Sequence, residues 1–459
     1  MLKSIILLFP RLKYRSGDPP LGICSIAGQL KKIYPNLEIH LLDTTFKNSF
    51  KSVITKIKKI KSQALGVYID SVMYLQIKNL LKELRSYIPI IIAGGPHSTI
   101  YPESLLDVVD IVVRGEGEKT MEDLILALPK EDLDTIPGLY FKKNGKIYCT
   151  SDEPQRPNLN ELEFPALDML GNLENYIETW HYLDPINPQK RGLNVIASRG
   201  CCFNCSYCQP TLRYLFGKKI RYKNPEYLVG EISYYVKRFG VNNFFFHDDT
   251  LPVDKNWIEN FCNLILENNL MINWGCNSRI DTVDEEILNL MYKAGLRVIH
   301  YGIESSSPRI VNQIYNKGIK INQIREIIHL TKKIGIQPSG FFMLGAPTET
   351  IIEMLRTISF SLGLELTEAS FSITTPFYGT YLYQQVKADS RYKILESNVD
   401  YYSQVSLKRK GFPSFLISYL QKFAVITFYM SPKRWKYVFR HLLSFRGMKK
   451  LYNKMARFF

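Results

Sequence analysis

The chain has 459 residues, of which 46% are hydrophobic and 22% are charged, and its formal net charge is +16. This composition excludes a disordered chain, and the length predicts two or three domains rather than one core. No uncharged apolar run is long enough to cross a membrane, and the apolar part of the opening MLKSIILLFP is too short for a secretory signal. We therefore expect a cytoplasmic protein with reduced thiols.

The first 135 residues alternate short apolar runs with amphipathic helical patterns. Buried strands are predicted at 4–9, 38–43, 64–69, 88–95 and 110–118, and helices at 21–33 and 74–87. Such alternation predicts an α/β domain of the doubly wound, Rossmann-like kind, with a parallel sheet between helices. Ligands of these sheets bind beyond the carboxyl ends of the strands, where Gly94-Gly95 and Gly115-Glu116-Gly117 fall.

Residues 136–190 predict a hairpin at 138–150, with an Asn144-Gly145 turn, followed by a Pro- and Asn-rich linker. A second alternation fills residues 191–390. Its strands are predicted at 193–198, 242–249, 272–277, 297–304, 337–345 and 368–374. Six such units predict a partial or complete parallel (β/α) barrel with its function at the carboxyl ends of the strands. Residues 391–459 then form a basic, helical C-terminal region.

The stretch RGCCFNCSYCQ, residues 199–209, directly follows the first barrel strand. Cys201, Cys205 and Cys208 have the spacing CxxxCxxC. Three thiolates leave one iron of a four-iron cluster open to another ligand. The alternatives are a zinc site that lacks one ligand, or reduced structural thiols. Since neither a second CxxC pair nor a paired histidine motif occurs, iron–sulfur ligation is favoured over zinc.

This loop resembles the cluster loop of the radical S-adenosylmethionine (radical SAM) superfamily. The resemblance implies that the three cysteines hold a 4Fe-4S cluster, whose fourth iron is chelated by the amino and carboxylate groups of S-adenosylmethionine. It also implies that Tyr207 packs near the cofactor. Cys202 occupies a spacer position of the motif, so it is predicted to be a packed or spectator thiol and not a ligand.

Later strand motifs resemble the same superfamily, in the same order. They are FFFHDD (244–249), WGCNSRID (274–281), HYGIESSS (300–307) and FFMLGAPTET (341–350). Asp248 or Asp249, depending on strand phase, is predicted to meet the methionine ammonium group. Further S-adenosylmethionine contacts are implied for Ser278 and Arg279 at the carboxylate, for Glu304 and Ser305 at the ribose and carboxylate end, and for Gly345 at the adenine.

The first domain resembles the cobalamin-binding domain that precedes the barrel in one large subgroup, and the whole resemblance covers about residues 1–390. It implies that cobalamin contacts Gly94, Gly95, Gly115, Glu116 and Gly117. Many such domains carry a DxHxxG motif whose histidine binds cobalt, but this chain reads DTTFKN at 43–48, with Thr45 in place of the histidine. We therefore expect no protein histidine on cobalt, and we expect His97 to be a hydrogen-bonding residue.

The resemblance implies an enzyme with three cofactors, namely the cluster, S-adenosylmethionine and cobalamin. A 5′-deoxyadenosyl radical would take a hydrogen atom from an unactivated substrate carbon, and cobalamin would deliver a methyl group to it. Ring closure or rearrangement with the same cofactors is the alternative reaction. A non-catalytic cobalamin sensor is the alternative of another class. The expected partners are a small-molecule or lipid-like substrate and an electron donor such as flavodoxin or ferredoxin.

The last residues carry most of the charge. No acidic residue follows Asp400, whereas 13 lysines and arginines do, interleaved with aromatic and aliphatic residues. Such helices predict either peripheral contact with an anionic membrane or a structural cap on the barrel, and these two alternatives stay open. Nucleic acid is the least expected partner.

Overall fold

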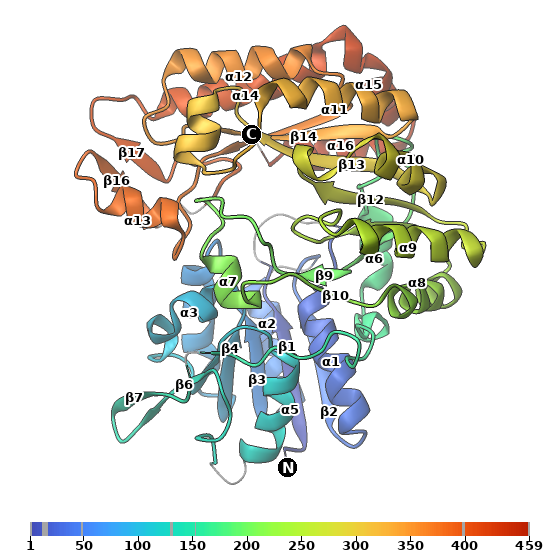
Figure 1. Cartoon of the computed structure of the whole chain (residues 1–459). Helices are drawn as coiled ribbons and strands as arrows, with labels where there is room; N and C mark the ends of the chain where they lie inside the picture. Colours follow the sequence, from blue (N-terminus) through green and yellow to red (C-terminus); the bar gives the residue numbers. More distant parts are fainter. Residues whose placement is uncertain are drawn as a thin grey trace. The chain divides into compact units, whose positions relative to one another are not determined.

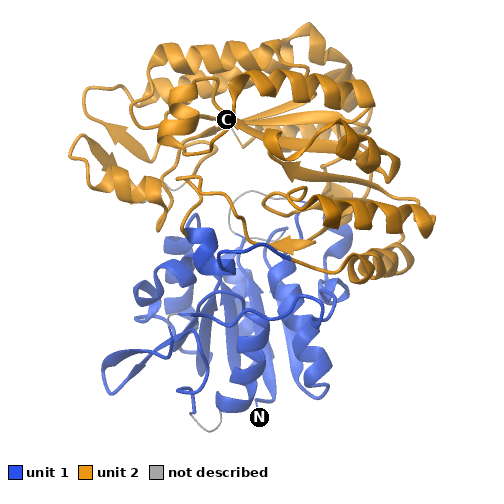
Figure 2. Ribbon diagram, in the orientation of Figure 1, with its two compact units in different colours: residues 1–176, 211–221 blue, residues 177–210, 222–459 orange. Residues whose placement is uncertain are grey.

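A computed structural model describes residues 2–11, 17–46, 49–128, 132–151, 153–396 and 400–457. The chain forms two compact units (Figure 2). Unit 1 comprises residues 1–176 and 211–221, and unit 2 comprises residues 177–210 and 222–459. The predicted linker region 136–190 therefore divides between the two units, and a short later segment returns to unit 1.

Unit 1 contains a seven-stranded sheet of order β2-β1-β3-β4-β5-β6-β7. The strands are β1 Ser4–Phe9, β2 Glu38–Asp43, β3 Ala64–Tyr68, β4 Ile90–Gly94, β5 Ile111–Val113, β6 Leu139–Lys143 and β7 Lys146–Cys149. The first five are parallel, and the last two are added antiparallel. The strand predicted at 110–118 is shorter than expected because Gly115 adopts a left-handed φ of 71° and a helix begins at Glu118.

Helices cover both faces of this sheet (Figure 1). They are α1 Leu21–Ile33, α2 Phe50–Ile60, α3 Tyr74–Leu84, α4 Pro96–Ile100 and α5 Glu118–Ala127. α1 packs beside α5, and α2 packs beside α3. Because both faces are covered, strand residues such as Ile6, Leu65 and Ile91 are fully buried, which explains the continuous apolar runs of the sequence. The doubly wound α/β prediction is confirmed.

The Pro- and Asn-rich segment after the hairpin is packed rather than free. The N–H of Ala166 donates to Cys24 O on α1 at 2.9 Å, and the N–H of Glu163 donates to Gln29 Oε1 at 3.2 Å. A Cβ at Gly28 would lie 2.5 Å from Phe164 O. Gly28 therefore allows this backbone to lie directly on α1, a close approach that composition alone does not reveal.

Unit 2 contains a six-stranded sheet of order β15-β14-β13-β12-β11-β8, parallel throughout. Its strands are β8 Leu193–Val195, β11 Asn243–Phe246, β12 Asn273–Ser278, β13 Leu296–Glu304, β14 Gln337–Leu344 and β15 Glu368–Ile373. The helices between them are α8 Pro225–Phe239, α9 Lys255–Glu267, α10 Glu285–Lys293, α11 Ile321–Ile334 and α12 Ile351–Gly363. β8 and β15 remain the two ends of the sheet, so the prediction of a partial six-stranded barrel is confirmed.

The inside of this curved sheet is partly filled from the segment that precedes β8. Trp180 and Leu183 form a buried cluster with Phe245 of β11 and Val298 of β13. The indole N–H of Trp180 donates to Asn194 Oδ1 at 2.8 Å, which fastens the segment to β8. The barrel interior near the amino-terminal ends of the strands is therefore filled by hydrophobic side chains.

The C-terminal region is an integral part of unit 2. After α13 Tyr381–Lys387 and the strand pair β16 Tyr392–Ile394 and β17 Leu407–Arg409, it forms α14 Phe415–Met430, α15 Trp435–Leu442 and α16 Phe445–Met455. α14 packs on β15 and α12, and its Gln421 and Phe428 are fully buried. The predicted helical tail is thus confirmed. None of the described helices combines the length and apolar character that a membrane crossing requires.

Candidate functional site

The cysteine loop lies beyond the carboxyl end of β8. Cys205 is buried, Cys201 and Cys208 are half-buried, and Cys202 is exposed; all four are free thiols. Within the described ranges, no three His, Cys, Asp or Glu side chains gather around a single point as a mononuclear zinc site would require. A four-iron cluster has no such requirement, since each cysteine ligates a different iron.

The loop is fixed by bonds to its own carbonyls and to a later segment of unit 2. The buried Gln209 amide donates to Cys201 O at 3.3 Å and to Phe203 O at 3.1 Å. The N–H of Ser206 donates to Tyr315 O at 2.8 Å, and its hydroxyl donates to Ile314 O at 2.6 Å. These bonds set the loop conformation before any cofactor binds. Gln209 was not singled out by the sequence, in which it is simply the residue after the motif.

The thiols lie close enough to influence one another. Burial raises the pKa of Cys201 to about 12, with further contributions from Asp249, Cys202 and Cys205. Burial also raises the pKa of Cys208, and the nearby Cys205 and Asp249 add to it. The bare thiols are therefore protonated at neutral pH, and thiolates at these positions need the positive charge of bound metal. The donor set fits an iron–sulfur cluster.

A buried ion pair stands beside the loop. Lys317 Nζ lies 2.6 Å from Glu304 Oε1, and the Tyr207 hydroxyl donates to the same oxygen at 3.1 Å. Lys317 also donates to the Tyr207 oxygen at 3.3 Å. Glu304 ends β13 with a left-handed φ of 65°, which turns its side chain out of the strand alternation. Lys317 was missed because no motif of the sequence includes it.

Arg279 is directed at the cluster loop. Its Nη1 lies 3.7 Å from Cys205 Sγ, and its guanidinium carbon lies 3.7 Å from the ring centroid of Phe203. Nε and Nη2 donate to the two carboxylate oxygens of Asp281 at 2.8 and 2.7 Å. The guanidinium expected at the methionine carboxylate is therefore already held by Asp281. The neighbouring Ser278 hydroxyl is buried and donates to Arg279 O.

The two aspartates after β11 have different surroundings. Asp248 is buried and accepts hydrogen bonds from Ala197 N and from the backbone and hydroxyl groups of Ser198, so it fastens β11 to the end of β8. The Asp249 side chain, in contrast, is exposed. The neighbouring protein atoms still remove part of its hydration, which is the main reason why the pKa of Asp249 is raised to about 6. The negative charge of Asp248 is the second reason. Asp249 is the aspartate that remains available to a ligand.

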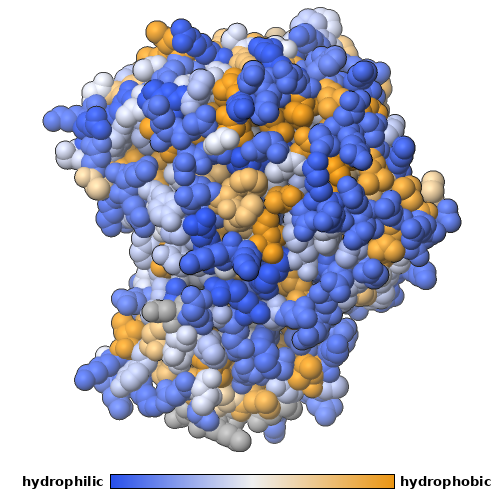
Figure 3. Space-filling view, viewed as in Figure 1, coloured by the Kyte–Doolittle hydropathy of each residue, from blue (hydrophilic) through white to orange (hydrophobic). Residues whose placement is uncertain are grey.

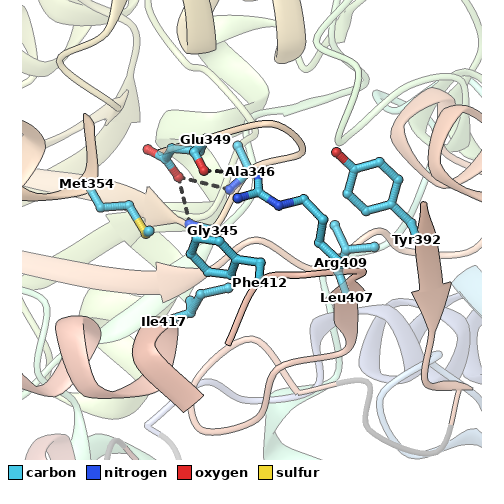
Figure 4. Close-up of a pocket in the computed structure, with 9 residues that line it drawn as sticks. All are labelled: Gly345, Ala346, Glu349, Met354, Tyr392, Leu407, Arg409, Phe412 and Ile417. Carbon is cyan, nitrogen blue, oxygen red and sulfur yellow. Dashed lines mark hydrogen bonds between the residues drawn. The ribbon is translucent and has the colours of Figure 1, made fainter. Parts of the chain in front are cut away.

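Ser305 and Gly345 contact other parts of unit 2. The buried Ser305 hydroxyl lies 3.0 Å from Thr357 Oγ1 on α12. Gly345 has a φ of 84°, its N–H donates to Glu349 Oε2 at 2.7 Å, and a Cβ there would lie 2.9 Å from Ile417 of α14 (Figure 4). The close approach that glycine permits here is to the tail helix.

In unit 1, the glycine turns follow β4 and β5, as the sequence predicted. Gly95 has a φ of 100°, and a Cβ there would lie 2.9 Å from Ile69 O; Gly94 has open space beside it. Added carbons at Gly115 and Gly117 would meet Pro154 and Ile26. The buried Glu116 is paired with Arg221. Gly94 is thus the turn position with room for a ligand.

Neither Thr45 nor His97 is arranged as a cobalt ligand. Thr45 is buried, and its hydroxyl donates to Asp43 Oδ1 at 2.7 Å and accepts from the Tyr176 hydroxyl at 2.8 Å. The buried ring of His97 stacks on Tyr74 with centroids 3.9 Å apart. Its Nδ1 lies 3.1 Å from Ser71 Oγ, and its Nε2 lies 3.2 Å from Ser104 Oγ. Residues 47 and 48 of the DTTFKN segment lie outside the described residues.

Comparison with known proteins extends these observations. The family model of the radical SAM superfamily matches residues 195–361, and that of the B12-binding domain matches residues 12–125. An uncharacterized methyltransferase of Pyrococcus horikoshii is 32% identical over 429 residues, which cover 90% of this chain and 88% of that protein. The chain belongs to the cobalamin-binding radical SAM family. This assignment confirms the three predicted cofactors, which are a 4Fe-4S cluster, S-adenosylmethionine and cobalamin.

Two further relatives indicate the range of this radical SAM family. The anaerobic magnesium-protoporphyrin IX monomethyl ester cyclase of Rubrivivax gelatinosus is 28% identical over 399 residues, covering 83% of this chain and 70% of that protein. The structure of the radical SAM methyltransferase TsrM of Kitasatospora setae, with cobalamin and a 4Fe-4S cluster bound, superposes with a TM-score of 0.71. That likeness has 17% identity and covers 86% of this chain and 80% of TsrM, so it supports the fold.

Proposed function

We propose that this radical SAM enzyme transfers a methyl group to an unactivated carbon of a small-molecule or lipid-like substrate. The observation that carries the proposal is the intact cysteine loop, held ready by Gln209 and Ser206, in a chain that also has a B12-binding domain. A non-catalytic sensor has no use for such a loop. The similar Pyrococcus and Kitasatospora proteins are named methyltransferases, whereas the Rubrivivax cyclase supports ring closure as the second candidate.

Cys201, Cys205 and Cys208 would hold the cluster, and Cys202 would not, because it alone of the four is exposed. When bound, the cluster supplies one electron to S-adenosylmethionine, and cobalamin supplies a methyl carrier. The electron has to come from a reduced donor such as flavodoxin or ferredoxin. In unit 1, the turns Gly94-Gly95 and Gly115-Glu116-Gly117 would border the cobalamin, with Gly94 offering the open space.

The chain's own residues supply charge and position. Asp249, whose carboxylate is exposed whereas that of Asp248 is already bonded, would accept a hydrogen bond from the methionine ammonium group. Tyr207, Glu304 and Lys317 form one bonded group that fixes the tyrosine of the cysteine loop to the end of β13. Arg279 places a cation beside Cys205, where the reduced cluster gains negative charge. Ser278, Ser305 and Gly345 would act mainly by shaping the strand ends.

The proposal is tested by incubating anaerobically reconstituted protein with S-adenosylmethionine, cobalamin, a low-potential reductant and a cell extract as the source of substrate. We expect 5′-deoxyadenosine together with S-adenosylhomocysteine, and label from the S-methyl group in a product. The Cys201→Ala variant is the control. Formation of 5′-deoxyadenosine without S-adenosylhomocysteine would favour cyclisation or rearrangement. Absence of both from protein with a complete cluster would favour the sensor.

A further inference from the structure

One side of α14 is apolar and exposed along its whole length. Its exposed residues are Phe415, Tyr419, Phe423, Ile426 and Met430, with exposed fractions of 75, 64, 41, 40 and 70%. Their spacing of three or four residues places them on one helical face, while the opposite face packs into unit 2. A surface helix normally turns polar residues to water, so this face requires a partner.

The apolar surface continues beyond α14. The indole N–H of Trp435, at the start of α15, donates to Met430 O at 2.9 Å, and the Trp435 ring is half-exposed. On the other side, α12 packs beside α14 and exposes 61% of Ile352. In Figure 3, apolar residues interrupt the hydrophilic surface over the outer helices of unit 2. We call Trp435 and the five exposed α14 residues the outer apolar face.

The basic residues of the tail fall into two groups, those bonded to unit 2 and those exposed to solvent. At least six of the 13 basic residues after Asp400 bond to carbonyl or carboxylate groups of unit 2, namely Arg409, Arg434, Arg440, Arg446, Lys450 and Lys454. These residues fasten the tail to the barrel. The tail therefore forms the structural cap that was one of the two sequence predictions. Fewer positive charges are exposed to a membrane than the 13 basic residues suggest.

Four exposed lysines lie at the ends of the outer apolar face, and a fifth, Lys449, lies on α16. Lys408 and Lys410 precede α14, and Lys433 and Lys436 flank Trp435 after it; all four are exposed. An apolar stripe with aromatic residues, flanked by lysines and without acidic residues, is the composition of helices that lie in the interface of an anionic bilayer.

We propose that the outer apolar face docks reversibly on an anionic lipid bilayer, with α14 lying in the plane of the membrane surface. A second copy of the chain is a poorer occupant, since a symmetric pairing of two α14 helices would bring lysine-bearing ends together. Nucleic acid is poorer still, because it would leave the apolar residues in water. The contact is peripheral, as no described helix is suited to cross the membrane.

The test uses full-length protein and phosphatidylcholine vesicles with and without phosphatidylserine. Removing the tail is not a usable test, because it would expose the barrel surface that Gln421 and Arg434 cover. The apolar variant is Phe415→Gln with Phe423→Gln, and the charge variant is Lys433→Glu with Lys436→Glu. Each lysine near an anionic surface contributes about fivefold to affinity, so we expect the charge variant to bind at least about tenfold more weakly.

The matched controls alter exposed residues elsewhere in unit 2: Met271→Gln for the apolar variant, and Lys237→Glu with Lys293→Glu for the charge variant. We expect the wild type and both controls to sediment with anionic vesicles, less so at raised salt, and not with neutral vesicles.

Wild-type protein that does not bind anionic vesicles at low salt would overturn the proposal. So would variants that unfold like the wild type and bind equally well. A wild-type dimer that becomes monomeric in the apolar variant would assign the face to a second copy instead. The assay needs no turnover, so its result is independent of the proposed reaction.

Discussion

Lys317 Nζ lies 2.6 Å from Glu304 Oε1, and both side chains are almost completely buried. Each charge offsets the cost of burying the other, since either charge alone would be strongly unfavourable in the interior. The Tyr207 hydroxyl completes it by donating to the same carboxylate oxygen. Space for the pair comes from Gly302, where a Cβ would lie 2.5 Å from Lys317 Nζ and 2.7 Å from Glu304 Oε1.

Replacing Gly302 with alanine is therefore expected to separate this ion pair. The overpacking should lower the free energy of unfolding by about 1–3 kcal/mol, measured by urea denaturation. Gly230→Ala is the matched control, because Gly230 lies in α8 with no atom within 4 Å of an added Cβ. Alanine there should leave stability unchanged or raise it by up to about 1 kcal/mol. Equal effects of the two substitutions would show that the pair does not depend on Gly302.

The cysteine assignment predicts a specific pattern of iron loss. Anaerobically reconstituted wild-type protein should hold about four irons at this site. Cys201→Ala, Cys205→Ala and Cys208→Ala should each lose the cluster, measured as iron content and charge-transfer absorption. Cys202→Ala should keep it, since Cys202 is exposed and at a spacer position. Loss of the cluster in Cys202→Ala alone would show that the ligand assignment is wrong.

Arg279 should tune the reduction potential of the bound cluster. Its N–H group points at Cys205 Sγ, and a cation there favours the more negative reduced state. Arg279→Gln should therefore lower the potential, by about 60 mV if the lost interaction is about 1.4 kcal/mol. A redox titration followed by electron paramagnetic resonance measures it. Arg309→Gln, which removes a guanidinium paired with Glu353, is the control. An unchanged potential in Arg279→Gln would assign the residue a purely structural role.

Cobalamin should bind without a histidine of the protein on cobalt. Thr45 occupies the usual position and is bonded to Asp43, while both ring nitrogens of His97 face serine hydroxyls. Electron paramagnetic resonance of the cob(II)alamin form should show no nitrogen splitting from a protein ligand, and His97→Ala should leave the spectrum unchanged. Nitrogen splitting that disappears in His97→Ala would instead identify His97 as the ligand.

The attachment of the tail should depend on pH through Asp184. Burial alone would raise the pKa of this carboxyl, but Lys454, His441 and Lys450 lower it to about 2. Because its ordinary pKa is about 3.9, the stabilisation is complete above about pH 4 and is lost as the pH falls toward 2. Its size is about 2–3 kcal/mol.

Asp184→Asn should therefore destabilise the protein at neutral pH by about 3–5 kcal/mol, since the buried Lys450 loses its carboxylate partner and Lys454 keeps only Glu368. The free energy of unfolding should then fall less steeply between about pH 4 and pH 2 than in the wild type. Asp389→Asn, which breaks an exposed pair with Arg391, should have little effect. If Asp184→Asn matched this control, the tail would be held by apolar packing alone.

The sequence by itself determined the elements and the cofactor chemistry. Residues 4–9 form a strand where predicted, because a strand buried on both faces must be continuously apolar. Residues 38–43 also form a predicted strand, but β2 is at the edge of the sheet and none of its residues is fully buried. The cysteine spacing is equally local, since its ligands lie within eight consecutive residues. The hydrophobic pattern also indicated six barrel strands, although not where the two units divide.

The tertiary structure alone decided which charges meet. Lys450 lies 266 residues from Asp184, and no periodicity links two such positions. In the sequence the 13 basic residues of the tail look alike; folding buries some against carboxylates and leaves Lys433 and Lys436 in solvent. The choice between Asp248 and Asp249 was open for the same reason, because strand phase beyond Phe246 depends on the bonds that Ser198 makes. Hydrophobic patterns are local and can be read along a chain, whereas ion pairs depend on which distant residues the topology brings together.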